Sequence, residues 1–418
     1  MERVDPRPAR YQVLMVGLLS LNFGILFFDR NALNFLMPFV QPDLHLSNTQ
    51  VGLLASALSL TWAVAGFLIG RFSDKTGRRK SIIVAATLAF SACSFLSGIA
   101  ASFAMLLGAR LLMGFAEGGV LPISQSLTAD QVAPERRGLA MGVMQNFGSN
   151  LLGSFAAPVL LVTFATAFGW RHAFYLAGIP GIISALLILW LVREPVRAKG
   201  AGAPAERLSI LQAFGHRNIQ VCAVIAILLV SYLVVCWAFM PLFLTKVRGV
   251  DPGTMGWLMG TLGISATVGS FVIPGVSDIV GRKPVMIAVP LLGVILPLGA
   301  LFFQGDLAML AAIFFFGWAL TGVFPLFMAT IPSETVDPRH TATALGLVMG
   351  TGEVLGGVFS PTLAGAAADR FGLGAPLWIM LGLGIAAGLL ALLLTETAPR
   401  RRMQNIQSEF HEVELRRE

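Results

Sequence analysis

Charged residues are scarce in this sequence. Only 12% of its 418 residues are Asp, Glu, Lys or Arg, whereas soluble globular proteins carry about 25%. A chain with so few ionised groups cannot cover a water-exposed surface, and 56% of its residues are hydrophobic. The composition therefore excludes a soluble globular protein and predicts an all-α integral membrane protein, solvated largely by the lipid bilayer.

Cysteine and histidine are also rare, with three and five copies. Cys93, Cys222 and Cys236 all lie in apolar stretches, and their spacing matches neither a metal site nor a disulfide framework. The sequence contains no His-Glu-x-x-His and no cofactor-binding fingerprint. We therefore expect no bound metal, no cofactor and no enzymatic activity, which argues against an intramembrane enzyme.

Long apolar stretches fill most of the chain. A helix needs about 20 predominantly apolar residues to cross the hydrocarbon core of a bilayer. Twelve stretches of this kind occur. We predict membrane helices over residues 12–38, 50–70, 81–103, 104–125, 139–165, 173–192, 218–243, 254–275, 284–303, 307–331, 341–366 and 376–395.

Basic residues are distributed unevenly between the loops. Twelve spans place both termini on one side, and if that side is the cytoplasm, the outer loops hold only four of the 29 Lys and Arg residues. The inner loops and tails hold 23 of them. The positive-inside rule therefore predicts that both termini are cytoplasmic. This distribution also explains the net charge of +7 without a nucleic-acid partner.

A repeated motif and a polar segment divide the chain. The sequence SDKTGRR at residues 73–79 follows the second predicted span, and SDIVGRK at residues 277–283 follows the eighth. Equal patterns at equivalent loops indicate an internal duplication. Residues 194–216 are polar and rich in Gly, Pro and Ala, as is typical of a linker. The predicted parts are an N-terminal six-helix bundle (1–193), a cytoplasmic linker (194–216), a C-terminal six-helix bundle (217–399) and a cytoplasmic tail (400–418).

The first copy of this motif carries a family resemblance. The segment GRFSDKTGRRK at residues 70–80 resembles the loop motif that joins the second and third helices in the major facilitator superfamily. Together with the twelve predicted spans and the central linker, the resemblance covers nearly the whole chain. It implies the two-bundle fold of that superfamily, a transport function and a monomer.

A narrower resemblance lies in the first and fourth spans. Asp29-Arg30, together with RLLMGFAE at residues 110–117, is similar to the anion:cation symporter family, as is the stretch 170–181. This resemblance implies that Asp29 and Glu117 bind protons, and that Arg30 and Arg110 bind an organic anion. It further implies a transporter of the cell inner membrane that carries a carboxylate, such as a sugar acid or an aromatic acid.

One position departs from that family. Glu353 stands in the eleventh span, where family members often carry an Asn that helps to bind the substrate. This extra acid, and a total of three Tyr against 30 Phe, favour a substrate with fewer hydroxyl groups. Glu353 itself is a candidate for a third proton site, a hydrogen-bonding partner of the substrate or a structural partner.

Five ionisable residues fall inside predicted spans: Asp29, Arg30, Arg110, Glu117 and Glu353. A charge at the bilayer centre costs at least ~2.5–3.5 kcal/mol on insertion scales, so we expect these side chains to face a watery cavity or one another. Arg110 and Glu117 share one face of a helix, ~10 Å apart along its axis. A purely structural salt-bridge network between the first and fourth spans is the alternative.

The residue types indicate how two ligands would be coupled. Arg binds carboxylates in bidentate fashion, and a desolvated carboxyl group takes up a proton more readily than one in water. Protonation of Asp29 or Glu117 would free an arginine for the substrate anion. Other polar or aromatic side chains are candidates either for substrate contact or for packing between helices. They are Gln145, Asn146, Tyr232, Trp237 and Trp318.

Charged residues also stand at the cytoplasmic ends of the spans. We predict that Asp74, Arg78, Asp278 and Arg282 form a conformational latch. In such a latch, loop charges and a helix terminus pair in one state of the cycle and separate in another. The alternative is a solvated charge cluster that only fixes the topology.

The predicted function is proton-coupled symport of a small organic anion by alternating access. Its expected partners are that anion, protons as the coupling ion, and the lipid bilayer. A proton-coupled drug or metabolite exporter is the alternative, although the fifth span lacks the Gly-Pro-x-x-Gly-Gly-like motif common in such exporters. A non-transporting sensor would need a signalling domain, and the sequence suggests none.

Overall fold

A computed structural model of the protein describes residues 8–194, 212, 214–337 and 340–398. Most of the predicted linker (194–216) and all of the predicted tail (400–418) lie outside these residues. Within them, all regular elements are helices, and twelve helical segments are long and apolar enough to cross a membrane. The chain is therefore a multi-pass membrane protein, and the predicted number of spans is confirmed.

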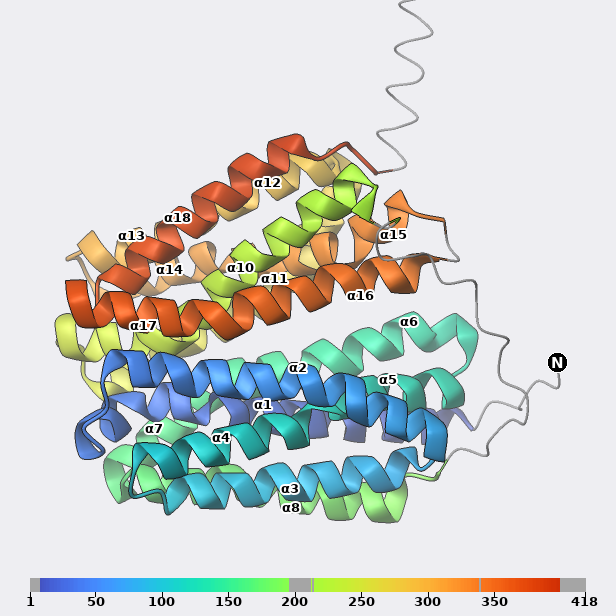
Figure 1. The fold of residues 1–418 in the computed structure, drawn as a ribbon, viewed down its shortest axis with the longest axis horizontal. Helices are drawn as coiled ribbons and strands as arrows, with labels where there is room; N and C mark the ends of the chain where they lie inside the picture. The colour runs from blue at the N-terminus through green and yellow to red at the C-terminus, as the bar shows by residue number, and fades with distance from the viewer. Residues whose placement is uncertain (1–7, 195–211, 213, 338–339, 399–418) are drawn as a thin grey trace, which may run out of the picture. The chain divides into compact units, whose positions relative to one another are not determined.

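Several spans consist of two helices in succession (Figure 1). The first six spans are α1 (Ala9–Asp43), α2 (Asn48–Thr76), α3 (Arg79–Gly98), α4 (Phe103–Gly118) with α5 (Val120–Gln131), α6 (Pro134–Gly142) with α7 (Ala157–Phe168), and α8 (Trp170–Leu191). The last six are α10 (Arg217–Leu242), α11 (Pro252–Val280), α12 (Arg282–Gly293) with α13 (Ile295–Phe302), α14 (Leu307–Trp318) with α15 (Ile331–Thr335), α16 (Thr341–Thr351) with α17 (Phe359–Phe371), and α18 (Ala375–Leu390).

The fifth and eleventh spans contain π-helical turns. In the fifth span these are η1 (Val143–Phe147) and η2 (Ser149–Ala156), which lie between α6 and α7. In the eleventh span, η7 (Gly352–Val358) joins α16 to α17. π-Helical turns are rare and frequently mark functional sites. Two further π-helical turns, η3 (Phe243–Val247) and η5 (Leu326–Thr330), lie in the seventh and tenth spans.

Local signals fix many helix ends, including several that extend beyond the apolar stretches. Ser47 and Gln50 form a capping box at the start of α2, with distances of 3.1 Å and 3.0 Å. The side chains of Ser102 and Asp306 accept hydrogen bonds from backbone N–H groups in the first turns of α4 and α14. Gly77 ends α2 with a φ of 70°. Such caps satisfy backbone groups that have no partner within the helix.

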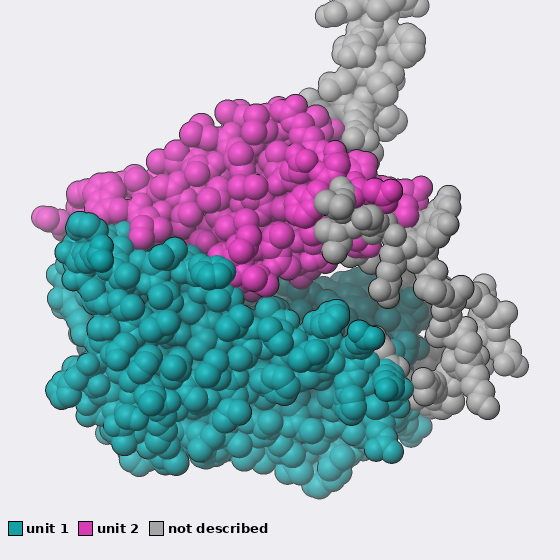
Figure 2. All heavy atoms as spheres, in the orientation of Figure 1, with its two compact units in different colours: residues 1–202, 234–267, 357–376 teal, residues 203–233, 268–356, 377–418 magenta. Residues whose placement is uncertain are grey.

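The contacts divide the described chain into two compact units (Figure 2). Unit 1 consists of Met1–Gly202, Val234–Thr267 and Gly357–Pro376, and unit 2 consists of Ala203–Leu233, Val268–Gly356 and Leu377–Glu418. Unit 1 thus combines the predicted N-terminal bundle with parts of the seventh, eighth and eleventh spans. The grouping reflects contacts between sequence halves within unit 1, and the bundle boundary at residues 194–216 stays a prediction.

Unit 1 owes its tight packing to close approaches between helices. α2 packs on α4, and α3 packs on α8 (Figure 1). A Cβ atom on Gly118 of α4 would lie 2.4 Å from the carbonyl oxygen of Trp62 on α2. Only glycine permits this approach, which brings the Trp62 segment next to the residues at the end of α4.

Spans two and eleven meet within unit 1. The carboxylate of Asp369 on α17 accepts hydrogen bonds from the backbone N–H groups of Asn48 and Thr49, each at 2.8 Å, and from the Thr49 hydroxyl at 2.5 Å. The hydroxyl oxygens of Ser56 and Thr362 are 2.7 Å apart. Asp369 therefore caps the N-terminus of α2 at the end of the molecule that the basic residues assign to the outside.

Candidate functional site

Four charged residues of unit 1 come together inside the first and fourth spans. α1 supplies Asp29 and Arg30, and α4 supplies Arg110 and Glu117. Asp29 and Glu117 are fully buried, Arg110 is 2% exposed, and the Arg30 side chain is 17% exposed. Of the four, Arg30 is therefore the one that a solute can reach without a rearrangement of the cluster.

Arg110 is held by one hydrogen bond to the main chain of α1. Its Nη1 atom donates to the carbonyl oxygen of Arg30 at 3.0 Å and lies 3.5 Å from the sulfur of Met113. Nε and Nη2 have no hydrogen-bond partner among the described residues. A buried guanidinium with two unused donor atoms is suited to a carboxylate that arrives as a ligand.

Glu117 lies beside Arg30 without a close contact. Its Oε2 atom is 3.9 Å from Nη1 of Arg30, and within the described part of the chain neither carboxylate oxygen accepts a hydrogen bond. The Arg30 guanidinium is also 5.2 Å from the ring centre of Trp62 and 5.7 Å from that of Phe27. Arg30 is thus shared between a loosely paired acid and two aromatic faces.

Asp29 is hydrogen-bonded at one oxygen. The Ser94 hydroxyl of α3 donates to Oδ1 at 2.5 Å, whereas Oδ2 has no partner among the described residues. Asp29 also interacts electrostatically with Arg110 and Glu117. An ionised carboxylate buried this deeply is costly, so the site favours either a cationic partner or a proton at this position.

The other predicted substrate contacts fall into two groups. Gln145 is half-buried and accepts a hydrogen bond from Gln125 at 3.3 Å, and Asn146 is exposed. In unit 2, Tyr232 is fully buried, and its hydroxyl donates to the carbonyl of Gly293 at 2.8 Å. Trp318, also of unit 2, is 1% exposed, and Trp237 of unit 1 is 7% exposed. Burial of these three rings indicates a packing role, and substrate contact by any of these five residues stays a prediction.

Glu353 belongs to the π-helical turn η7 of unit 2, where its side chain is half-buried. Glu353 belongs to unit 2, whereas the four clustered residues Asp29, Arg30, Arg110 and Glu117 belong to unit 1. The role of Glu353 in proton binding, substrate binding or structure stays a prediction.

Two of the predicted latch residues, Asp278 and Arg282, form an ion pair with each other. Arg282 forms ion pairs with Asp278 at 2.6 Å and with Glu334 at 3.0 Å. Arg78 precedes α3 and is exposed. Asp74 lies in α2, and its side chain is outside the described part of the structure. These contacts belong to one arrangement of the chain, so the latch itself stays a prediction.

Acidic caps occur at equivalent places in both halves. Glu194, after α8, accepts the backbone N–H of Lys80 at 3.0 Å. Glu396, after α18, accepts those of Arg282 and Lys283 at 2.8 Å and 3.1 Å. Each acid thus caps the helix that follows a copy of the repeated motif. The sequence signal for these two caps is an acid shortly after the sixth predicted span and another after the last one.

Ser94, Trp62 and Phe27 are the site residues that sequence reasoning missed. A usable signal existed for Ser94, because Thr87, Ser91 and Ser94 follow a helical spacing and all three are fully buried. A polar stripe inside an apolar span indicates contacts with buried polar groups. No comparable signal distinguishes Trp62 and Phe27 from the other aromatic residues.

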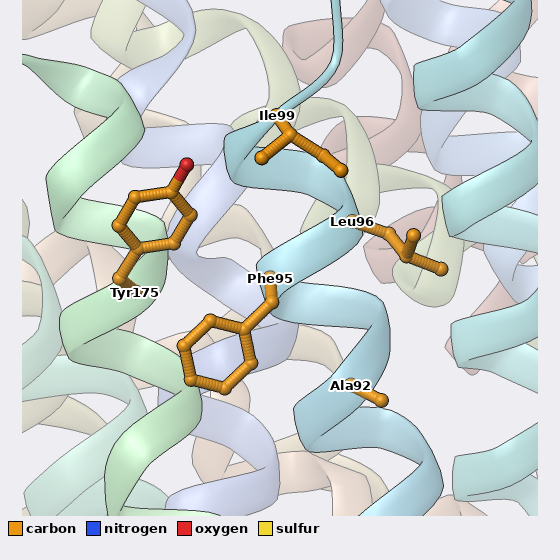
Figure 3. Close-up of a pocket in the computed structure, with 5 residues that line it drawn as sticks. All are labelled: Ala92, Phe95, Leu96, Ile99 and Tyr175. Atoms are coloured by element: carbon orange, nitrogen blue, oxygen red, sulfur yellow. The ribbon is translucent and has the colours of Figure 1, made fainter.

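A separate apolar pocket of about 610 Å³ lies against α3 and α8 (Figure 3). It is lined by Ala92, Phe95, Leu96, Ile99 and Tyr175. Figure 3 shows the rings of Phe95 and Tyr175 on neighbouring helices, with their centres 5.8 Å apart. The lining carries no charged group, so this pocket is unsuited to an ionised ligand.

Twelve spans and a buried cluster of two arginines with two carboxylates define a membrane transporter rather than an enzyme. The sequence profile described as the Major Facilitator Superfamily matches residues 19–244 and 222–416. The chain belongs to the Major Facilitator Superfamily.

Named relatives and solved structures agree with this assignment. The chain is 27% identical over 342 residues to the "Probable 4-methylmuconolactone transporter" of Cupriavidus pinatubonensis (strain JMP 134 / LMG 1197), covering 79% of this chain and 78% of that protein. It is 28% identical over 299 residues to the "Hexuronate transporter" of Bacillus subtilis (strain 168), covering 68% of each. Its fold is similar to the crystal structure of a bacterial homologue of the human lysosomal transporter Spinster, with a TM-score of 0.77, 21% identity, and coverage of 92% and 96%.

Proposed function

We propose that this transporter imports a small organic anion with a carboxylate group together with protons, by alternating access. The carboxylate binds at Arg30 and Arg110, and protons bind at Asp29 and Glu117. Aromatic acids and sugar acids are the proposed substrate classes; one similar relative is named for 4-methylmuconolactone and another for hexuronates.

The observation that carries the proposal is the loose pairing of Glu117 with Arg30. Two arginines and two ionised carboxylates balance in charge. A substrate carboxylate would add an unbalanced negative charge to a buried site, which is unfavourable unless one acid takes up a proton. Protonation of Glu117 removes its attraction for Arg30, 3.9 Å away, and leaves the guanidinium to the substrate. Binding of the anion and of the proton therefore favour each other.

The proposal is tested by transport into proteoliposomes. Uptake of radiolabelled benzoate and of radiolabelled glucuronate by the purified, reconstituted protein is measured with and without a pH gradient. A pH-sensitive dye inside the vesicles reports acidification of the lumen. We expect that an accepted acid accumulates with the pH gradient and acidifies the lumen. The corresponding neutral amides should not be carried, because Arg30 and Arg110 require a negative partner.

Variants of the acids and of an arginine then separate proton coupling from substrate binding. Asp29→Asn and Glu117→Gln should each lower proton-driven accumulation at least tenfold, while exchange of labelled for unlabelled substrate persists. Arg30→Gln should abolish both activities. Proton-driven accumulation at the original rate in both acid variants would show that these carboxylates do not couple transport to protons.

A further inference from the structure

The hydroxyl group of Ser94 lies between a proposed proton site and the backbone of another helix. Its oxygen is 2.5 Å from Oδ1 of Asp29 on α1 and 3.0 Å from the carbonyl oxygen of Phe174 on α8. Ser94 is fully buried on α3. One side chain therefore connects three helices at the residue that the proposed function makes a proton carrier.

A serine hydroxyl has one proton to donate and can accept hydrogen bonds as well. Both neighbouring oxygens of Ser94 are acceptors while Asp29 is ionised, so the hydroxyl can satisfy only one of them fully. When Asp29 carries a proton, the carboxylic acid becomes a donor, and Ser94 can accept from it. Its own hydroxyl proton is then available to the Phe174 carbonyl.

We propose that Ser94 is a positioning residue that hydrogen-bonds Asp29 in both of its protonation states. The hydroxyl donates to the ionised carboxylate. When Asp29 is protonated, the hydroxyl accepts from Asp29 and donates to the carbonyl of Phe174. The proposal rests on the proposed function only in taking Asp29 as a proton carrier. Ser94 stabilises the ionised form by donation, and so it sets the pH at which Asp29 releases its proton. It does this without contact to the substrate.

The place of Ser94 is tightly defined by its neighbours. A Cβ atom on Gly178 of α8 would lie 3.2 Å from Cβ of Ser94 and 3.0 Å from the carbonyl oxygen of Ser91. The glycine lets α8 approach α3 closely, which keeps the Phe174 carbonyl within reach of the hydroxyl. The ring of Phe174 also lies 6.0 Å from the Arg110 guanidinium carbon, so the same turn of α8 contacts the substrate-binding arginine.

Other charged groups around Asp29 must be held constant in any test. Arg110 and Glu117 act on it from α4, Cys93 on α3 lies within electrostatic range, and Arg30 follows it on α1. The contact from α8 is the backbone carbonyl of Phe174, reached through Ser94. None of these groups is altered by a substitution at Ser94 itself.

The test compares Ser94→Ala with the matched control Ser91→Ala. Ser91 is equally buried on the same face of α3, but its hydroxyl donates to the Thr87 carbonyl at 2.9 Å. Uptake of the acid identified in the transport screen is measured from pH 5 to pH 9. The hydrogen bond to the charged carboxylate is stronger than the one to the neutral acid, so its loss destabilises the ionised form of Asp29 more than the protonated form. The midpoint for Ser94→Ala should therefore move up by about one pH unit. Ser91→Ala should keep the wild-type midpoint.

A second readout keeps the proposal testable if Ser94→Ala transports poorly. Infrared difference spectra of the purified protein follow the carboxylic acid band that is absent in Asp29→Asn, and the titration of this band should shift upward in Ser94→Ala. Ser94→Cys, with a weaker donor, should give a smaller shift. An unchanged midpoint in both measurements, or the same shift in Ser91→Ala, would overturn the role of Ser94. Absence of any band dependent on Asp29 would instead refute Asp29 as the proton site.

Discussion

At the scale of single residues, the site is distinguished by hydrogen-bonding capacity that the described chain leaves unused. Two nitrogen atoms of Arg110, both oxygens of Glu117 and one oxygen of Asp29 are buried without a partner among the described residues. Buried polar atoms of this kind are rare in stable proteins. Five such atoms in one cluster support the proposal that these residues bind a ligand.

The aromatic neighbour of Arg30 gives a prediction at this scale. The ring centre of Trp62 lies 5.2 Å from the Arg30 guanidinium carbon, and under the proposed function it holds Arg30 while Glu117 is protonated. Trp62→Leu should raise the KM for the substrate anion about threefold to tenfold, with little change in maximal rate, because a cation–π contact contributes about 0.5–2 kcal/mol. Initial uptake rates over a range of substrate concentrations measure both constants.

A matched control for this prediction is Trp190→Leu. Trp190 on α8 is 74% exposed, and its loss should leave the KM unchanged. If Trp62→Leu and Trp190→Leu give the same kinetic constants as the wild type, Trp62 does not position Arg30.

At the scale of helices, acidic caps tie the end of each half to its third helix. Glu194 binds the start of α3, and Glu396 binds the start of α12. The negative carboxylate complements both the free N–H groups and the positive end of the helix dipole. The duplicated motif thus includes a partner that lies more than a hundred residues away in each half.

The cap at Glu396 should contribute measurably to stability. Glu396→Ala removes backbone hydrogen bonds to a carboxylate, including the two from the start of α12, and we expect a loss of about 1–2 kcal/mol in the free energy of unfolding. The melting temperature of the detergent-purified Glu396→Ala protein should be several degrees below that of the wild type. Glu396→Gln keeps one acceptor oxygen, so its melting temperature should lie between those two values. Equal melting temperatures for all three proteins would show that the cap is dispensable.

Sequence patterns predicted the helices well and the partners of the site poorly. Apolar stretches of about 20 residues determine where the bilayer is crossed, and isolated charges such as Asp29 and Glu117 are conspicuous within them. Ser94 and Trp62 could not be identified in this way, because their roles depend on which helix faces which. The helix ends also extend further than predicted, since capping residues such as Ser47 continue the helix past the apolar stretch.

At the scale of the whole molecule, spans from the two sequence halves contact one another within unit 1, and span two with span eleven is one such pair. Asp369 caps α2, and the hydroxyls of Ser56 and Thr362 are 2.7 Å apart. Sequence reasoning missed this contact, because nothing in either helix marks the other as its neighbour. The proposed alternating access through the outer side would require these contacts to break.

A reversible cross-link tests this requirement. In a Ser56→Cys/Thr362→Cys double variant, the side-chain positions are close enough for a disulfide, and the three native cysteines are buried. Oxidation should reduce uptake to background, and a reducing agent should restore it. Each single variant serves as the control and should transport alike with oxidant and reductant. Undiminished uptake by a fully cross-linked protein would show that this contact stays closed during transport.

The π-helical segment η2 has a consequence for the length of the fifth span. A π turn accommodates an additional residue in a helix and disturbs the regular pairing of its carbonyl groups. One such carbonyl, that of Gly153, is bound by the side-chain amide of Asn31 at 3.1 Å, close to the charged cluster. Deletion of a single residue between 149 and 156 would let the segment return to the regular α-helical repeat and draw the carbonyl of Gly153 back into the helix. A fifth span shortened in this way would therefore lose the hydrogen bond that joins it to Asn31 of α1.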